Sequence, residues 1–278
     1  MLVSAMTRTN DKARVIDHYD RISPYYRALW GEHIHHGYWI RGDESKDTAQ
    51  IQMIEHLVEA AAIKPHARIL DVGCGFGGSS IYLARKYGVE ATGITISPLQ
   101  VEMANKTAEQ AGVSASFLCM DAESMHFDQS FDVLWSVESI SHYQDVPGFF
   151  VKAAKVLKPG GTLAITDWFK QESLHPRDHK KFLRPIEDGM MVELHTMRDY
   201  ERYLEAAGFA VSRSEVLNQH TAKSWEIGLN IIKDKALWEL AASYGPEFIR
   251  FLRAFRAIRS GFLSGNFVNG LLVAAKSA

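Results

Sequence analysis

The amino-acid sequence predicts an α/β protein with a doubly wound, seven-stranded and mostly parallel sheet, an N-terminal helical cap and a helical lid. Three observations predict this class. Short apolar runs typical of buried strands alternate with helical segments between residues 66 and 170. A glycine-rich loop, Asp71-Val-Gly-Cys-Gly-Phe-Gly77, follows the first of these runs. Two more strand-like runs, 209–216 and 266–276, lie near the end of the chain. Because strands joined by helices form right-handed crossovers, the first five strands are expected to be parallel.

The composition fits a globular protein and disfavours several classes. The chain has 278 residues, 46% of them hydrophobic, and a net charge of -2, which disfavours nucleic acid as a partner. Cys74 and Cys119 are too few for a disulfide framework or a four-cysteine zinc site. The first twenty residues lack the apolar core of a signal peptide, and no apolar run reaches the roughly 18–20 residues of a membrane helix. We therefore expect a soluble, cytoplasmic protein without membrane or nucleic-acid partners; the oligomeric state is not predicted.

Residues 1–65 are expected to form the cap. A helical pattern extends over about 11–62, with an interruption around 37–42. Six aromatic residues are concentrated within about twenty residues of this segment: Tyr19, Tyr25, Tyr26, Trp30, Tyr38 and Trp39. Such side chains either close over a ligand or pack the helices against the sheet.

Residues 66–170 are expected to form the cofactor-binding core. The predicted strands are 68–72, 90–96, 116–120, 131–136 and 162–169, and the predicted helices are 79–87, 99–111 and 146–157. The turn Lys158-Pro-Gly-Gly161 precedes the fifth strand. Ligands of doubly wound sheets bind at the carboxyl ends of the strands, so the site is expected in the loops that follow them.

Residues 171–278 are expected to supply the lid and the last two strands. Segments 171–208 and about 222–262 have helical patterns and flank the strand 209–216. Five apolar residues of these segments favour a pocket for an apolar or aromatic metabolite: Phe182, Met190, Met191, Trp225 and Phe262. The alternative is that they form the core of the lid itself.

The glycine loop on its own fits two cofactors. Gly73, Gly75 and Gly78 match the dinucleotide pattern GxGxxG, whereas Gly73, Gly75 and Gly77 match the tighter pattern GxGxG. Asp71 occupies a position that is usually apolar in nicotinamide-binding strands. The next strand ends without the acidic residue that binds a nicotinamide ribose. Both features disfavour a nicotinamide oxidoreductase.

Several motifs resemble those of the class I S-adenosylmethionine-dependent methyltransferases, which have a Rossmann-like fold. The glycine loop is similar to the first motif of that family, Asp121-Ala122 to its adenine-binding pair, and Leu157-Lys-Pro-Gly-Gly161 to its late glycine turn. The stretches Gly93-Ile-Thr-Ile-Ser-Pro-Leu-Gln100 and His35-His-Gly-Tyr-Trp39 resemble more narrowly the tocopherol-type, sarcosine/dimethylglycine and natural-product or sugar methyltransferases. The resemblance implies S-adenosyl-L-methionine as cofactor, S-adenosyl-L-homocysteine as product and a small-molecule methyl acceptor as partner.

The resemblance also implies which residues contact the cofactor: Tyr19, Tyr25, Asp71, Gly73, Gly75, Gly77, Thr95, Ser97, Gln100, Asp121, Ala122 and Glu138. Asp71 is expected near the methionyl ammonium, since carboxylate oxygens stabilise a cationic group. Thr95 stands where most of the family has the acidic residue that binds the ribose, so Ser97 and Gln100 are expected to replace it. Asp121 is expected to accept from the adenine amino group, or alternatively to cap a turn.

His142 is the predicted general base. It lies in Trp135-Ser-Val-Glu-Ser-Ile-Ser-His-Tyr143 after the fourth strand, and histidine titrates near neutral pH. Asp167, at the end of the fifth strand, is expected to orient His142 or to bind the acceptor, and related natural-product enzymes resemble this placement. The alternative for His142 is a structural hydrogen bond to a loop carbonyl.

The predicted reaction is methyl transfer to a small metabolite, with oxygen favoured over nitrogen or carbon as the acceptor atom. Cyclopropane-forming lipid methyltransferases carry a glutamate immediately before this histidine, whereas this chain has Ser141, so lipid cyclopropanation is not expected. The near-neutral charge disfavours RNA or DNA methylation. A nicotinamide oxidoreductase and a non-catalytic cofactor-binding protein are the distant alternatives.

Two groups of histidines suggest metal ligands but are incomplete. His33, His35 and His36 lie close together in sequence, and His175 and His179 have helical i, i+4 spacing. Neither group has its expected third ligand nearby, and methyl transfer needs no metal. We therefore expect no metal site.

Overall fold

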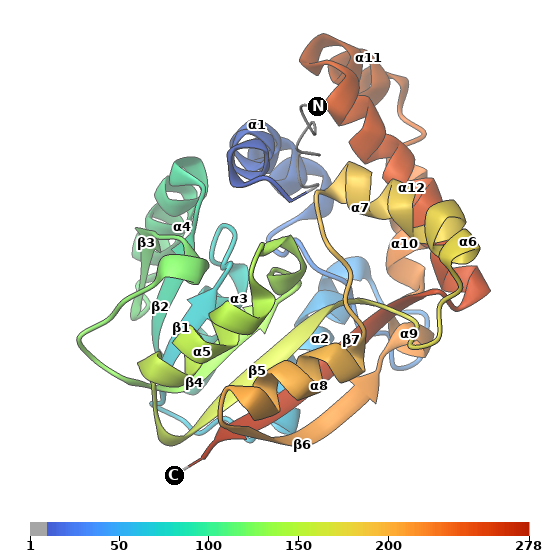
Figure 1. Cartoon of the computed structure of the whole chain (residues 1–278). Coiled ribbons are helices and arrows are strands. Elements are labelled where there is room, and N and C mark those ends of the chain that lie inside the picture. The colour runs from blue at the N-terminus through green and yellow to red at the C-terminus, as the bar shows by residue number, and fades with distance from the viewer. Residues whose placement is uncertain (1–9, 278) are drawn as a thin grey trace, which may run out of the picture.

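This computed structural model describes residues 10–277. A seven-stranded sheet lies at the centre of this part of the chain (Figure 1). The strands are β1 Arg68–Val72, β2 Glu90–Thr95, β3 Ala115–Cys119, β4 Phe131–Val137, β5 Leu157–Lys170, β6 Phe209–Val216 and β7 Phe267–Lys276. Their order is β3-β2-β1-β4-β5-β7-β6; β1 to β5 are parallel, and β7 is antiparallel to β5 and β6. The predicted fold class is confirmed. Predictions about residues 1–9 lie outside the described residues.

The helices divide into those that cover the sheet and those that lie above the carboxyl ends of its strands. The first group is α2 Lys46–Ala60, α3 Gly78–Tyr87, α4 Pro98–Ala111, α5 Val146–Val156 and α8 Met197–Ala206. The second group is α1 Lys12–Trp30, α6 Pro176–Asp178, the π-turn His179–Leu183, α7 Arg184–Met190, α9 Asn218–Thr221, α10 Lys223–Ile231, α11 Lys235–Tyr244 and α12 Pro246–Ser264. Side-chain caps fix several starts: Asp11 caps α1, Ser45 caps α2 and Thr196 forms a capping box on α8.

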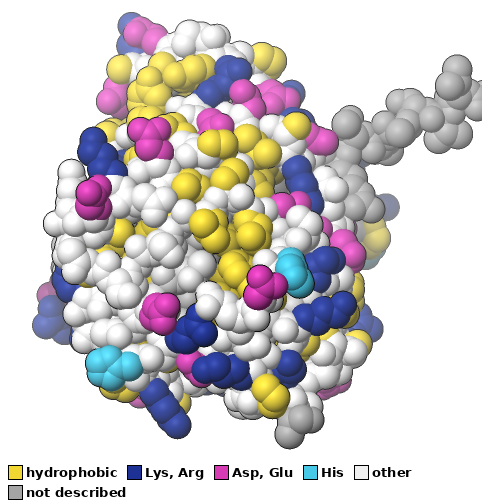
Figure 2. Space-filling view, turned by 90° about the vertical axis from the view of Figure 1, so that its left-hand side faces the viewer, with side chains coloured by type: hydrophobic (Ala, Val, Ile, Leu, Met, Phe, Trp, Pro, Cys, Tyr) yellow, Lys and Arg dark blue, Asp and Glu magenta, His cyan; other side chains and the backbone are white. Residues whose placement is uncertain are grey.

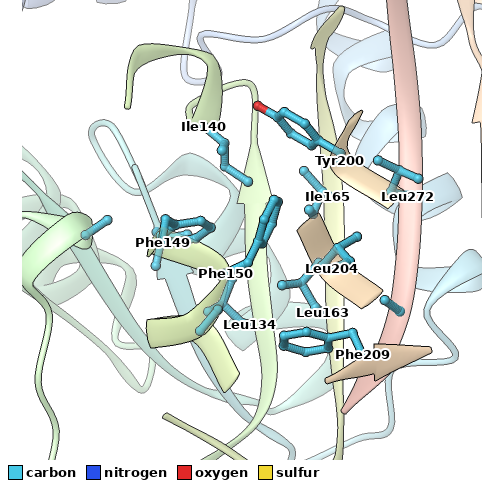
Figure 3. Close-up of a cluster of buried hydrophobic side chains, with 14 of the residues drawn as sticks. Leu134, Ile140, Phe149, Phe150, Leu163, Ile165, Tyr200, Leu204, Phe209 and Leu272 are labelled. Atoms are coloured by element: carbon cyan, nitrogen blue, oxygen red, sulfur yellow. The ribbon is translucent and has the colours of Figure 1, made fainter. Parts of the chain in front are cut away.

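One face of the sheet is covered by α5 and α8 (Figure 3). Phe149 and Phe150 from α5 and Tyr200 and Leu204 from α8 are fully buried against β4, β5 and β7. The segment 171–208 was expected to belong to the lid, but α8 instead forms the crossover that connects β5 to β6. Its amphipathic pattern of buried residues at i and i+4 matches a sheet-covering helix as well as it matches a lid.

The opposite face is covered by α2 and α3. Met53, Ile54 and Leu57 of α2 are fully buried, and they pack in one cluster with Ile69 of β1 and Trp135 of β4. The described part of the predicted cap is therefore divided, because α2 packs against the sheet whereas α1 lies in the upper part of the view in Figure 1.

A separate apolar cluster joins α1 to the lid helices. It contains Ile22 of α1, Met190 of α7, Trp225 of α10, and Phe251 and Phe255 of α12. These helices cover the edge of the sheet formed by the carboxyl ends of the parallel strands. A ligand bound at this edge would therefore be covered by apolar side chains.

The outer surface shows both apolar and charged side chains. On the face shown in Figure 2, hydrophobic side chains gather along the middle and top, with charged side chains scattered among and around them. None of the helices within residues 10–277 combines the length and apolarity needed to cross a membrane.

Candidate active site

The glycine loop connects β1 to α3 and has a backbone that favours glycine. Gly73, Gly75 and Gly77 have φ values of 72°, 54° and 82°, in the left-handed region. A Cβ on Gly73 would lie 2.2 Å from the Cβ of Ser139. The loop therefore packs directly on the segment after β4, and a side chain at position 73 has no room.

A large cavity opens beside this loop and encloses about 1020 Å³ of empty space, part of it open to solvent. It brings together ten of the predicted site residues: Tyr19, Asp71, Gly73, Gly75, Thr95, Gln100, Asp121, Ala122, Glu138 and His142. Four predicted residues do not line it: Tyr25, Gly77, Ser97 and Asp167. Its size and its mixed polar and apolar lining suit a nucleoside-sized ligand.

Asp71 places a carboxyl group at the bottom of this cavity. Its side chain is buried, Ser80 Oγ donates to it at 2.6 Å, and burial raises the pKa of Asp71 to about 7. A buried carboxylate is stabilised by a cationic partner. The site therefore offers a place for a ligand ammonium, and the brace to Ser80 shows that Asp71 also orders its own loop.

The residues after β2 tie α1 to the cavity wall. Thr95 Oγ1 donates to Gln100 Oε1 at 2.8 Å, and Gln100 Nε2 donates to Ser23 Oγ of α1 at 3.1 Å. Ser97 caps α4 and donates from its hydroxyl to Asp20 of α1. Ser97 was predicted to face the ribose, but its hydroxyl is used in this link between helices.

Asp121 caps a turn, one of the two alternatives from the sequence, and its place in the cavity lining leaves the adenine contact as a prediction. Its Oδ1 accepts from the backbone N–H of Glu123 at 2.9 Å, which caps a 3-10 turn, and it also lines the cavity. Its Oδ2 pairs with Lys12 of α1 at 2.6 Å, and Lys12 also contacts Glu123 at 2.8 Å. The start of α1 is thus held electrostatically over the rim of the cavity.

Tyr19 and His142 form a hydrogen-bonded pair at the inner end of the cavity. His142 Nδ1 lies 3.0 Å from the carbonyl oxygen of Met191, and its Nε2 lies 3.1 Å from the hydroxyl of Tyr19. Since a carbonyl only accepts, Nδ1 carries the proton, and Nε2 accepts from Tyr19. Burial lowers the pKa of His142 to about 4, so the ring is neutral at neutral pH.

Asp167 was predicted as a catalytic residue, but it lies behind the site rather than in it. Its carboxyl group accepts from the backbone N–H groups of Ser141 and Trp168, at 2.9 and 2.8 Å, and from the hydroxyl of Tyr200 at 3.0 Å. Burial raises the pKa of Asp167 to about 7. Asp167 therefore anchors the turn that carries His142, which agrees with the orienting role and not with acceptor binding.

Tyr25 was predicted at the methionyl group, yet it faces the lid. Its hydroxyl lies 3.4 Å from that of Tyr244 on α11, and its ring packs among the lid helices. Tyr25 is six residues after Tyr19, which places the two side chains on different faces of α1. Gly77 likewise serves packing, because a Cβ there would lie 2.5 Å from the ring of Phe117.

A second cavity of about 670 Å³ adjoins the first. The residues that line both cavities are Tyr19, Ile34, His35, Glu138 and His142. The residues that line only the second are His18, Tyr26, Trp30, His36, Ser141, Trp168, Met190, Ser224, Trp225, Phe251 and Phe255. Met190 and Trp225 were predicted here, whereas Phe182, Met191 and Phe262 lie outside the lining.

The sequence analysis missed two aromatic residues of α12 that line the second cavity, Phe251 and Phe255. Phe248, Phe251, Phe255 and Ile258 recur at helical spacing and are buried. That pattern predicts one buried helix face. The sequence does not show that Phe251 and Phe255 border a cavity, because the rest of its lining comes from α1, residues 34–36, the segment after β4, β5, α7 and α10.

The histidines of residues 33–36 serve the cavities. His35 Nδ1 lies 2.8 Å from the carbonyl oxygen of His36, and His36 Nδ1 lies 2.6 Å from Glu138 Oε1. His175 caps α6 and His179 contacts Glu187. Within residues 10–277, no group of three or more histidine, cysteine, aspartate or glutamate side chains is arranged to hold a metal ion.

Comparison with known proteins agrees with the fold. A family model described as mycolic acid cyclopropane synthetase matches residues 6–266. The probable chloroplastic tocopherol O-methyltransferase of Oryza sativa subsp. japonica is 34% identical over 239 residues, which cover 80% of this chain and 65% of that protein. The 27-O-demethylrifamycin SV methyltransferase of Amycolatopsis mediterranei (strain S699) is 34% identical over 244 residues, which cover 85% of this chain and 89% of that protein. The chain thus spans just under two thirds of the rice protein.

Solved structures with the same fold include the cyclase SpnF, with a TM-score of 0.84, 26% identity and coverage of 98% of this chain and 97% of that one. The mycolic acid cyclopropane synthase CmaA1, complexed with S-adenosylhomocysteine, has a TM-score of 0.85 and 22% identity, and the match covers 95% of this chain and 98% of that one. At that identity the second likeness shows the fold alone.

The family model and the relatives place the chain among the class I S-adenosylmethionine-dependent methyltransferases, whose cofactor is S-adenosylmethionine, and the sheet order and the glycine loop agree with that class. Within the class, the chain belongs to the mycolic acid cyclopropane synthetase family. The resemblance seen in the sequence motifs is confirmed, and a nicotinamide oxidoreductase is set aside.

Proposed function

We propose that this protein transfers the methyl group of S-adenosylmethionine to a hydroxyl group of a small, mostly apolar metabolite held in the second cavity. The observation that supports this is the shared wall between the cavities, formed by Tyr19, Ile34, His35, Glu138 and His142. A cofactor in the first cavity and an acceptor in the second would meet there. Since methyl transfer depends chiefly on holding two reactants in line, two adjoining cavities supply most of what the reaction needs.

The lining of the first cavity fits the parts of the cofactor. Asp71 would hold the methionyl ammonium beside the glycine loop, and Asp121 with Ala122 would border the adenine. Thr95 and Gln100 would border the ribose, although each already has a protein partner. When bound, the cofactor supplies a methyl group on a positively charged sulfur.

The lining of the second cavity supports an apolar or aromatic acceptor. Its walls carry Trp30, Trp168, Trp225, Phe251 and Phe255, whose faces pack well against flat or branched hydrocarbon skeletons. The rice relative is named as a tocopherol O-methyltransferase. The Amycolatopsis relative is named as a methyltransferase of 27-O-demethylrifamycin SV. We therefore favour an O-methyltransferase of a hydrophobic metabolite.

We propose that His142 takes up the acceptor proton through Tyr19. The acceptor hydroxyl gives its proton to the Tyr19 oxygen, and Tyr19 gives its own proton to His142 Nε2, the atom 3.1 Å away. The low pKa of His142 opposes this step. Methyl transfer favours protonation of His142, because the sulfur of the cofactor would lose its positive charge in the same step. The site would then hold one cation, the imidazolium, in place of the sulfonium.

Methyl transfer is favoured over cyclopropanation despite the name of the family. Ser141 stands where the cyclopropane-forming lipid enzymes have a glutamate, and its side chain borders the second cavity while its backbone N–H donates to Asp167.

The test uses S-adenosylmethionine labelled with a trideuterated methyl group. Incubation with a panel of phenolic and polyketide-type acceptors, and separately with vesicles of unsaturated phospholipid, is followed by mass spectrometry of the products. We expect methyl ethers that retain every deuterium atom of the label. A lipid product that has lost one deuterium would show cyclopropanation, and no labelled product with any acceptor would contradict methyl transfer.

A pair of variants tests the proton acceptor. His142→Ala should lower turnover by about 100-fold or more while the affinity for S-adenosylhomocysteine stays nearly unchanged. His126→Ala, which removes an exposed imidazole, is the matched control and should retain full turnover. Unchanged turnover in His142→Ala would remove His142 as the proton acceptor.

A further inference from the structure

A buried imidazole–carboxylate pair lies beside the acceptor cavity. Glu138 Oε1 is 2.6 Å from His36 Nδ1, and it also accepts from the backbone N–H of His36 at 3.1 Å and from Asn269 Nδ2 at 3.3 Å. The side chains of His36 and Glu138 are only 2% and 4% exposed. Glu138 itself has a left-handed backbone, with φ of 53°, which is costly for a non-glycine residue and recurs at functional sites.

This pair leaves one polar atom unused. Because Nδ1 of His36 lies against the Glu138 carboxylate and donates to it, Nε2 of the neutral ring carries a lone pair. Nε2 is buried and has no hydrogen-bond partner among the described residues. A buried acceptor without a partner is costly, so its persistence in a cavity wall points to a ligand group that completes it.

A second unused polar atom belongs to a ring that packs against that of His36. The rings of His36 and Trp225 are 4.7 Å apart at an angle of 69°, and both residues line the second cavity. The indole Nε1 of Trp225 is also buried without a partner in the described part of the chain. The two neighbouring side chains thus offer one acceptor and one donor, in surroundings that are otherwise aromatic.

We infer that His36 and Trp225 form a subsite that recognises a hydroxyl group of the acceptor, distinct from the hydroxyl that is methylated. A hydroxyl donates through its O–H and accepts through its oxygen, so it can pair with both His36 Nε2 and Trp225 Nε1. A ketone or an ether offers no donor to His36. His36 lines only the second cavity and not the shared wall, so this hydroxyl lies away from the methyl group.

The inference rests on the proposed function and narrows it to a hydrophobic acceptor with at least two hydroxyl groups. Glu138 is the positioning residue, since it fixes the tautomer of His36. The nearby carboxylate of Glu138 disfavours an anionic group at this subsite. Phe262 and Trp168, whose rings lie 6.1 and 5.8 Å from that of His36, exclude water from it.

The experiment measures binding, so that its outcome is independent of methyl transfer. The probes are isomeric naphthalenediols and their monomethyl ethers, titrated by calorimetry into the full-length protein saturated with S-adenosylhomocysteine. For the best-fitting isomer we expect the diol to bind the wild type roughly tenfold more tightly than its ether, which is the cost of leaving a buried acceptor unpaired. Equal binding of diol and ether, or no binding of any diol, would overturn the inference.

Three variants assign the preference to the subsite. His36→Phe removes the acceptor and Trp225→Phe removes the donor, and both keep an aromatic ring. In His36→Phe the diol and its ether should bind with nearly equal affinity. His36→Gln retains an acceptor and should recover part of it. His56→Phe is the matched control, because His56 also pairs with a glutamate, Glu215 at 3.1 Å, and lines neither cavity.

The thermal shift produced by S-adenosylhomocysteine checks that each variant is folded, since His36 and Trp225 do not line the first cavity. A preference for the diol that survives in folded His36→Phe would place the recognition elsewhere. Failure of this inference is distinguishable from failure of the proposed function. In the first case labelled methyl ethers still form, and in the second they do not.

Discussion

Asp71 should make cofactor binding depend on pH. Burial raises the pKa of its carboxyl group to about 7 in the ligand-free protein, and an ammonium bound beside it would favour the ionised form. Only the ionised form attracts the ammonium, so affinity follows the ionised fraction. From a pKa of about 7, that fraction rises roughly tenfold between pH 6 and pH 8. The affinity for S-adenosylhomocysteine should rise by the same factor.

Calorimetric titrations at pH 6, 7 and 8 measure this effect in the wild type and in Asp71→Asn. The amide does not titrate, so the variant should bind with little pH dependence and roughly 10–100-fold more weakly at pH 8, because a charge-assisted hydrogen bond is lost. Asp167 also has a pKa of about 7, but it does not line the cavity and remains in the variant. A pH dependence that persists unchanged in Asp71→Asn would refute the role given to Asp71.

The same shift has the opposite effect on the stability of the ligand-free protein. A carboxyl group whose pKa is raised by folding stabilises the fold below its unfolded pKa of about 4, and this contribution is lost as the pH rises through about 7. The melting temperature of the wild type relative to Asp71→Asn should therefore fall over that interval, and the cofactor product should restore it.

Three further substitutions have defined outcomes. Gly73→Ala places a Cβ 2.2 Å from that of Ser139 at a φ of 72°, so it should destabilise the fold by about 2–4 kcal/mol and abolish cofactor binding. Thermal scans with and without S-adenosylhomocysteine measure both effects. An unchanged melting temperature would contradict the packing of the loop against Ser139. Asp167→Asn replaces an oxygen that accepts from Ser141 and Tyr200, and chemical denaturation should show a loss of about 1–3 kcal/mol; a variant as stable as the wild type would mean that these bonds do not hold the turn. Tyr19→Phe should lower turnover about 100-fold with nearly unchanged affinity for S-adenosylhomocysteine. Tyr82→Phe, whose hydroxyl donates to Glu55 and which lines neither cavity, should retain full turnover; equal rates in the two variants would exclude the relay.

The cavity beside the glycine loop was predictable because its signals are local in sequence. The glycine loop needs left-handed backbone at fixed positions, and Asp71 and Asp121 lie at the ends of strands whose order follows from helix-connected crossovers. Short-range rules of this kind placed ten predicted residues around one cavity. Tyr25 failed because aromatic content was considered without the helix face on which each side chain lies.

The acceptor side was not predictable in the same way, because its contacts join distant parts of the chain. His36 and Glu138 are 102 residues apart, and Trp225 comes from a lid helix still further along. The sequence showed a group of histidines that lacked a third metal ligand, but it did not show that one of them faces a carboxylate. The sequence showed Asp167 as a polar residue at a strand end. Only the packing of α8 shows that its carboxyl group already accepts hydrogen bonds from Tyr200 and from the turn after β4.

The most direct test of the account is a crystal structure of the protein with S-adenosylhomocysteine and a naphthalenediol. The account predicts the amino acid part of the cofactor product beside Asp71 and Gly73, its sulfur at the wall formed by Tyr19, Glu138 and His142, and one diol oxygen facing that sulfur. A cofactor product bound in the second cavity, or a diol bound outside it, would contradict the division of the site into adjoining cofactor and acceptor cavities.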